Sequence, residues 1–176
     1  MRAPMFQQLP EVKEKKEKKH KQMSYLAGVV IFLLAVVFVA APLKLGVATQ
    51  NTPVGETSYC KIKVKNDSVS YADSVIVYLA VPSELISGSI IKSTTPDYAT
   101  VSEAEAIDIG LTMSSGYTAI KFDLGPALPQ TTKQVTIKLV FPYSTWFPIE
   151  ARGLVLAKDL LGRKTTTQFT VTIAPE

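Results

Sequence analysis

The sequence predicts an all-β domain, an antiparallel β-sandwich of seven or eight strands, preceded by one N-terminal transmembrane helix. Residues 23–43 form a run of 21 residues without a charged side chain, and about 20 apolar residues suffice for a helix to cross a bilayer. From residue 56 onward, apolar residues recur with period two in short runs separated by turn residues. This spacing is typical of a sandwich. A barrel is the alternative architecture.

Charge orients the predicted span. Residues 1–22 hold seven Lys or Arg against three Glu, whereas the rest of the chain holds 12 residues of each sign. Basic residues collect on the cytoplasmic side of a span. We therefore expect a single-pass protein of the cell membrane, with residues 1–22 as a basic cytoplasmic leader and the C-terminal domain outside. The lysines also suit anionic membrane lipid as a partner. Nucleic acid is not expected, because residues 11–21 lack interleaved aromatics and arginines.

Two forms of cleavage compete with this anchor. A secretory signal has a shorter apolar region of about 7–15 residues, and its small-residue sites would be Val39-Ala40-Ala41, followed by Pro42, or Gly46-Val47-Ala48. A pilin-like chain would be cut after its basic leader, but the glutamate usual just after that cut is missing from residues 23–27. The uncleaved anchor is therefore expected.

After the span, Pro42 and the polar residues 50–53 predict a juxtamembrane linker over 44–55. The β-domain then occupies residues 56–176. In its first strand, residues 59–65, Cys60, Ile62 and Val64 alternate with lysines. Residues 73–81 are apolar on both faces, which predicts a central strand. Further strands are expected at 85–91, 98–109, 118–124, 133–141, 146–158 and 165–173. Residues 101–106 are alternatively a helical turn, since Ala and Glu are good helix formers.

Two segments carry a family resemblance: residues 71–82, a strand that ends in proline, and residues 122–137, where Leu124-Gly125 and Leu128-Pro129 precede a Thr-rich turn and a strand. Over residues 56–141 the chain resembles Ig-like domains of prokaryotic, notably archaeal, envelope proteins, the CARDB-like conserved-repeat domains. It departs from them at Gln130, where the family usually has glycine. The archaellum stator proteins are similar in plan. Either resemblance implies an Ig-like sandwich used in adhesion, assembly or anchoring, without active-site residues.

Residues 141–148 concentrate four aromatics and two prolines in eight residues. Exposed aromatics bury a large area on contact, so Tyr143, Trp146 and Phe147 are candidate partner-binding residues. They could instead fold back over the open end of the sandwich or rest on the membrane interface. Asn66 begins an Asn-Asp-Ser sequon and is a candidate glycosylation site in a domain expected outside.

Catalytic chemistry is not predicted. Cys60 cannot form an internal disulfide, since it is the only cysteine, and is expected to be a buried core residue or else an intermolecular bridge. The one histidine, His20, lies in the leader, so no metal cluster or histidine triad is expected outside. Glu103 and Glu105 would share one face of a strand, as in a glycosidase pair or a calcium site, but a solvated edge explains them as well. No cofactor, metal or small-molecule substrate is predicted.

These observations predict a non-enzymatic, membrane-anchored envelope protein whose outer domain binds or scaffolds another surface or membrane protein. The alternative is an accessory single-span subunit of a larger membrane complex, such as an enzyme, a translocon or a glycosyltransferase.

Overall fold

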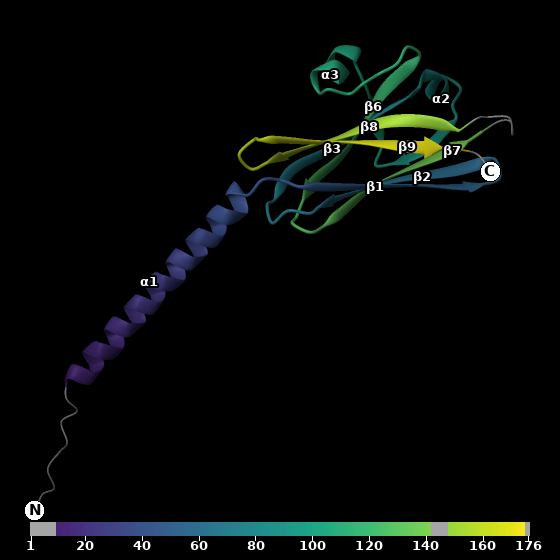
Figure 1. Ribbon diagram of the computed structural model, residues 1–176. Helices are drawn as coiled ribbons and strands as arrows, with labels where there is room; N and C mark the ends of the chain where they lie inside the picture. Colours follow the sequence, from purple (N-terminus) through teal and green to yellow (C-terminus); the bar gives the residue numbers. More distant parts are fainter. Residues whose placement is uncertain (1–9, 142–147, 175–176) are drawn as a thin grey trace, which may run out of the picture. The chain divides into compact units, whose positions relative to one another are not determined.

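A computed structural model describes residues 10–141 and 148–174, and within the N-terminal helix it describes the side chains of residues 19–36 (Figure 1). The chain divides into two compact units, Met1–Phe38 and Val39–Glu176. The first contains most of helix α1 (Pro10–Ala40), and the second is a β-sandwich with two short helices.

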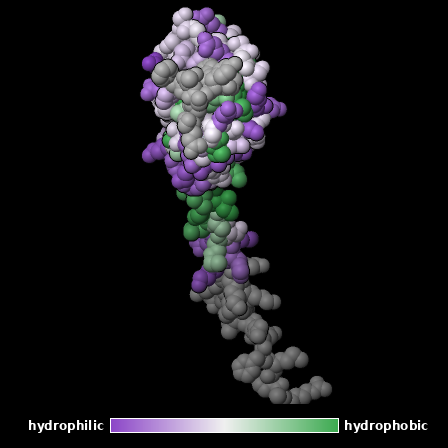
Figure 2. Space-filling model, turned by 90° about the vertical axis from the view of Figure 1, so that its right-hand side faces the viewer, coloured by the Kyte–Doolittle hydropathy of each residue, from purple (hydrophilic) through white to green (hydrophobic). Residues whose placement is uncertain are grey.

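Helix α1 runs without interruption from the basic leader into the apolar segment. Its large apolar side chains between Met23 and Val36 are 44–80% exposed, and in Figure 2 they form a green band beside the purple residues that precede them. Among the described residues, no helix combines the length and the hydropathy that crossing a membrane requires.

The end of the helix differs from the prediction. The uncharged run continues to Leu43, but α1 ends at Ala40, and Leu43 is only 6% exposed because it packs in the core of the sandwich. Pro42 gives the reason, since a proline lacks a backbone N–H and disfavours a helical conformation at the residue before it. The apolar part of the helix is therefore Met23–Ala40.

The second unit confirms a two-sheet antiparallel sandwich, with nine strands rather than seven or eight. The described strands pair only within the two sheets, so the barrel alternative is wrong. The β1 sheet has the order β1 (Leu45–Val54), β2 (Thr57–Asn66), β7 (Thr132–Val140), β4 (Ile91–Thr95). The β3 sheet has the order β5 (Tyr98–Val101), β6 (Tyr117–Ala127), β3 (Ala72–Pro82), β8 (Ile149–Asp159), β9 (Lys164–Ile173).

The predicted linker over 44–55 is wrong, because these residues form strand β1. It pairs with β2 over its whole length, from Leu45 opposite Asn66 to Val54 opposite Thr57. Leu45 and Val47 pack against the core, while the polar residues near Gln50 lie on an exposed edge strand. Only four residues, 41–44, separate the end of α1 from the start of β1.

The period-two pattern is confirmed in the core strands. Cys60, Ile62 and Val64 of β2 are at most 2% exposed. They share the core with apolar residues of β7, the neighbouring strand in the same sheet, and of β9 in the other sheet. Strand β3 is central, as predicted from its two apolar faces. Val77 and Leu79 point between the sheets, whereas Tyr78 belongs to a second apolar cluster on the outer face.

Helices replace two of the predicted strand segments. Helix α3 (Glu103–Asp108) confirms the helical alternative and covers the outer face of the β3 sheet, where Ala106 and Leu111 are buried (Figure 1). The predicted strand at 85–91 is wrong over its first part, which forms helix α2 (Ser83–Ser87). This helix follows Pro82 and places Leu85, which is fully buried, into the core.

The antiparallel strands give the sandwich two ends. We call the end formed by the turns at 41–44, 67–71, 128–131 and 160–163 the base. The opposite end, the far end, is formed by the turns at 55–56, 83–90 and 112–116 and by the strand ends Val140 and Ile149.

Candidate functional site

The predicted partner-binding residues Tyr143, Trp146 and Phe147 lie outside the described residues, and their role stays a prediction. The described residue before them, Phe141, is fully buried between the sheets. Its backbone N–H donates to the carbonyl of Glu56 at 2.8 Å. The described ends of the two strands on either side of the predicted residues in the sequence, Val140 of β7 and Ile149 of β8, lie at the far end of the sandwich.

Asn66, the predicted glycosylation site, is buried in the folded domain and not exposed on a surface turn. Asn66 is 1% exposed, and its Nδ2 donates to the carbonyl of Ser70 at 2.8 Å and to that of Ala127 at 3.3 Å. Its Oδ1 accepts from the backbone N–H and the hydroxyl of Ser68. A glycan on Nδ2 would have to displace these bonds, so the sequon is a structural element of the base.

Asn66 is the centre of a network that fixes the base. Its carbonyl accepts from the N–H of Gln130 at 2.8 Å, and its N–H donates to Thr131. The hydroxyl of Ser70 donates to the carbonyl of Ala41, and the N–H of Asp67 donates to Lys44 at 2.8 Å. Residues 41–44 are therefore tied to the turn at 67–71, and Asn66 ties the turn at 128–131 to the end of β2.

A second polar pair holds the turn at 160–163. The carboxylate of Asp159, whose side chain is 3% exposed, accepts from Nε of Arg163. It also accepts from the N–H of Leu161 and of Arg163, both at 2.9 Å. Burial alone would raise the pKa of Asp159, but these hydrogen bonds and the Arg163 charge outweigh burial and leave the pKa below its ordinary value.

Cys60 is the buried core residue that its strand position predicts. It is fully buried, and burial raises the pKa of its thiol to about 12. The thiolate is the reactive form of cysteine, so the folded domain presents no reactive thiol here. An intermolecular bridge through Cys60 is therefore excluded for the folded domain.

The carboxylates at 103–108 lie on helix α3 and not on a strand, so Glu103 and Glu105 do not form the same-face pair of a strand. The hydroxyl of Ser102 caps this helix by accepting from the N–H of Glu105. Glu105 also accepts from Nζ of Lys121 at 3.0 Å, and this hydrogen bond raises the pKa of Lys121. Burial and the Glu105 charge raise the pKa of Tyr78 beneath them. Across the described parts of the chain, no group of three His, Cys, Asp or Glu side chains could hold a metal ion.

A polar groove on the outer face of the β3 sheet is the candidate contact site that sequence reasoning missed. Thr112 borders it from the loop after α3, Arg152 from β8, and Gln168 and Thr170 from β9. Arg152 is exposed and forms no ion pair with a described carboxylate. These residues are far apart in sequence. The outward-facing positions of β8 that include Arg152 also include Glu150 and Lys158, so the sequence of this strand does not single out Arg152.

Gly153 allows the close packing beneath this groove. A Cβ at this position would lie 2.1 Å from the ring of Phe169, its partner on β9. The ring therefore occupies the space that a side chain would need, and this part of β8 requires glycine.

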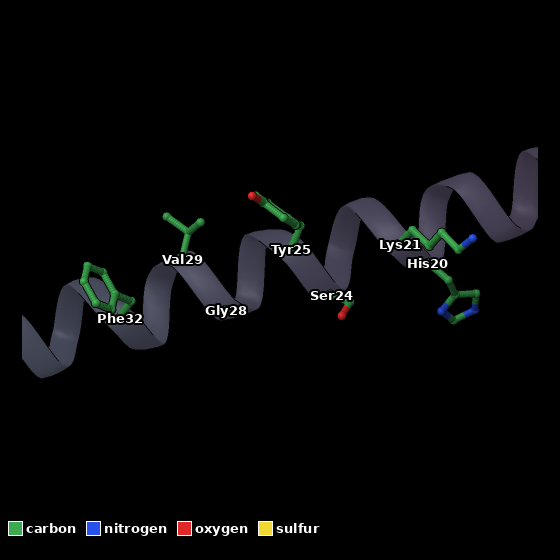
Figure 3. Close-up of a pocket in the computed structure, with 7 residues that line it drawn as sticks. All are labelled: His20, Lys21, Ser24, Tyr25, Gly28, Val29 and Phe32. Atoms are coloured by element: carbon green, nitrogen blue, oxygen red, sulfur yellow. The ribbon is translucent and has the colours of Figure 1, made fainter.

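Helix α1 has a shallow groove of its own over Gly28. Figure 3 shows Tyr25 and Val29 on one side of it and Ser24 on the other. A Cβ at Gly28 would meet no atom within 4 Å, so the gap is open. Ser24 and Gly28 are small residues four positions apart, and this spacing lets a second helix approach closely.

No family model matches the chain, and the search of curated proteins also finds no match. Several solved structures are similar in fold. Spo0M, a sporulation control protein of Bacillus subtilis, is 12% identical with a TM-score of 0.35, and the match covers 76% of this chain and 50% of that one. BslA, a bacterial hydrophobin, is 12% identical with a TM-score of 0.40, covering 77% and 98%.

A collagen-binding domain from a Staphylococcus aureus adhesin is 8% identical with a TM-score of 0.37, covering 73% of this chain and 96% of that one. The match to Spo0M, by contrast, covers only about half of that protein's length. At these identities and TM-scores, the likenesses carry no argument about function. None of the three is a CARDB-like domain by its description, and that resemblance stays a prediction.

Proposed function

We propose that the chain is a non-enzymatic, membrane-anchored envelope protein. In this proposal the apolar part of α1 spans the cell membrane once, residues 1–22 are cytoplasmic, and the sandwich lies outside, where it binds or scaffolds another surface or membrane protein.

The observation that carries the proposal is the exposure of α1. From Met23 to Val36 its large apolar side chains are 44–80% exposed on all sides of the helix. A helix that is apolar all round is normally buried in lipid or among other helices. The 18 residues Met23–Ala40 would extend roughly 27 Å as a helix, which is near the lower limit for a span.

The perturbed side chains support a non-enzymatic role. Among the described residues, the shifted pKa values belong to Cys60, Tyr78, Lys121 and Asp159. Cys60 is a core residue, Asp159 holds a turn, and Tyr78 and Lys121 both contact the helix that covers the β3 sheet. Each shift therefore has a structural cause, and no two of these groups form a nucleophile and its base.

For the partner surface we propose the far half of the sandwich, where Arg152 lines the polar groove. Arginine is enriched among residues that dominate binding energy, because its planar group forms several hydrogen bonds at once. The predicted partner-binding residues Tyr143, Trp146 and Phe147 follow β7 in the sequence, and the described end of β7, Val140, lies at the far end. A partner that contacts both would combine apolar anchors with one cation.

Carbonate extraction of membranes from cells that express the full chain tests the anchor. The wild-type chain should remain in the membrane pellet. Substituting both Leu33→Lys and Leu34→Lys should release it, because each lysine at the centre of a span costs about 3 kcal/mol. The matched control, Val54→Lys with Ile107→Lys, places two lysines at exposed apolar positions of the sandwich and should stay in the pellet. A wild-type chain in the supernatant would refute the anchor.

The accessory-subunit alternative is favoured by the groove over Gly28, which gives another helix a place to pack. Gly28→Ile adds a side chain in the groove, and its Cβ would meet no atom of this chain within 4 Å. If α1 packs in a complex, this substitution should lower the mass of the particle extracted in mild detergent. If α1 faces only lipid, the mass should not change.

A further inference from the structure

Large aliphatic side chains that remain exposed on the described sandwich gather at its base. Six such side chains are at least half exposed, and four of them lie on base turns. Val69 follows β2, Leu128 follows β6, and Leu160 and Leu161 follow β8. The other two, Val54 and Ile107, lie singly at the β1–β2 turn and on α3.

These aliphatic tips stand on turns that are held in place. Leu128 is in the turn whose residues Gln130 and Thr131 bond to Asn66. The N–H of Leu161 donates to Asp159. Tips on fixed turns lose little conformational entropy when they are buried, so this end is organised for contact before any neighbour arrives.

Basic residues are concentrated at the same end of the sandwich as the tips. The base turns, with the two strand residues on either side of each, carry six basic and three acidic residues. Two of the acidic residues, Asp67 and Asp159, form ion pairs with Lys65 and Arg163. By the same definition, the described residues of the far end carry three acidic residues and one basic residue. The basic residues of the base are Lys44, Lys65, Lys133, Lys158, Arg163 and Lys164.

The chain itself keeps the base near the end of α1. The four residues 41–44 span at most about 14 Å when extended, and Ala41 and Lys44 are already hydrogen-bonded to base turns. If α1 spans the membrane, the base cannot lie far from the lipid headgroups.

We propose that the base rests on the outer leaflet, with Leu128, Leu160, Leu161 and Val69 in the interfacial layer and the basic residues on anionic phospholipid headgroups. Apolar tips ringed by Lys and Arg are the arrangement by which proteins bind an anionic membrane surface. The inference rests on the proposed anchor, and it gives the sandwich a second, independent contact with the membrane.

Labelled full-length chains in vesicles test this contact. Single variants Leu128→Cys, Leu161→Cys and Val54→Cys carry an environment-sensitive fluorophore, and the native Cys60 is fully buried and stays unlabelled as long as the domain is folded. Val54 is the matched control, since it is as exposed as Leu128, at 60%, but lies at the far end. The vesicles contain phosphatidylcholine and phosphatidylglycerol with a lipid that is spin-labelled high on its acyl chain.

The proposal requires that the spin label quench the fluorophores at 128 and 161 several-fold more than the fluorophore at 54. The difference should shrink in vesicles of phosphatidylcholine alone. Equal quenching at the three positions, or quenching at none, would overturn the contact. Fluorophores at 128 and 161 that are shielded from aqueous iodide without lipid quenching would also overturn it, because protein would then cover the base. Flotation of the same samples separates the two proposals. If the chain floats with the vesicles but the fluorophores at 128 and 161 report an aqueous environment, only the contact is refuted. If the chain does not float with the vesicles, the anchor and the contact are both refuted.

Discussion

The base and the far end of the sandwich are built from the same antiparallel strands, yet they differ in charge, in exposed side chains and in hydrogen bonding. The base carries an excess of basic residues, four exposed aliphatic tips and the buried Asn66 network. The far end carries an acidic excess among its described residues, and the groove with Arg152 lies in its half of the sandwich.

This difference shows that a neutral domain can still be electrically polarised. Beyond residue 22 the chain has 12 basic and 12 acidic residues, so a count over the domain hides the separation. Charge acts over about one Debye length, near 8 Å at physiological salt. A binding partner at one end therefore interacts with the charge of that end and not with the net charge of the domain.

The largest expected effect comes from comparing two asparagines, one in each half. Asn66→Ala should lower the free energy of unfolding by about 3 kcal/mol, because it leaves several buried groups without a partner. Asn51→Ala should cost about 1 kcal/mol, since Asn51 is half-buried and its side chain bonds, among the described residues, to Ser58 and Ala174. Urea unfolding followed by circular dichroism measures both. Equal losses would remove the distinction between a locked base and the rest of the domain.

Gly153→Ala should cost about 2 kcal/mol, because the new Cβ would overlap the ring of Phe169. The double variant Gly153→Ala with Phe169→Leu should recover part of this loss, since it shortens the side chain that clashes. Thermal unfolding of the two variants provides the measurement. If the single variant is as stable as the wild-type chain, the close packing beneath the groove is not required.

Lowering the pH should reduce the stability of the sandwich through Asp159, which holds a turn at its base. Its pKa is lower when folded than its ordinary value of 3.8, so the folded chain holds this proton less readily than the unfolded chain does. The stability that Asp159 contributes is complete above the unfolded pKa and is lost as the pH falls through the folded pKa. Urea midpoints between about pH 5 and pH 2 should fall more steeply for the wild-type chain than for Arg163→Gln. Identical slopes would mean that the ion pair does not stabilise the turn.

The smallest effect on stability, within about 0.5 kcal/mol, is expected for Arg152→Ala, because this side chain is exposed and unpaired among the described residues. The same variant should reduce recovery of the partner after crosslinking and purification. Lys158→Ala is the matched control, since Lys158 lies on the same outer face of β8 at the base. Equal recovery from the two variants would exclude the groove as the partner surface.

Sequence periodicity predicted the strands that have one buried face and one face exposed to solvent. Cys60, Ile62 and Val64 alternate with lysines, and β2 is found where that pattern lies. Strand β1 was missed because its outward face carries Gln50 and Thr52, next to Pro53, and such residues on an exposed edge have the composition of a linker.

The sites were harder to predict because they depend on distant contacts. The sequon at Asn66 looked like a surface turn, but its side chain is buried and donates to the carbonyl of Ala127, 61 positions away. The groove joins Thr112, Arg152 and Gln168 from three separate segments. No local sequence pattern predicts that these residues lie close together, since their proximity follows from the order of strands in the sheet.

The most direct test of the account is the side of the membrane on which each unit lies. His20→Cys and Val54→Cys variants of the full chain are treated in intact cells with a maleimide that cannot cross membranes. The account predicts labelling at position 54 and none at position 20 until the cells are opened. Labelling at position 20 in intact cells, or labelling at position 54 only after lysis, would contradict it.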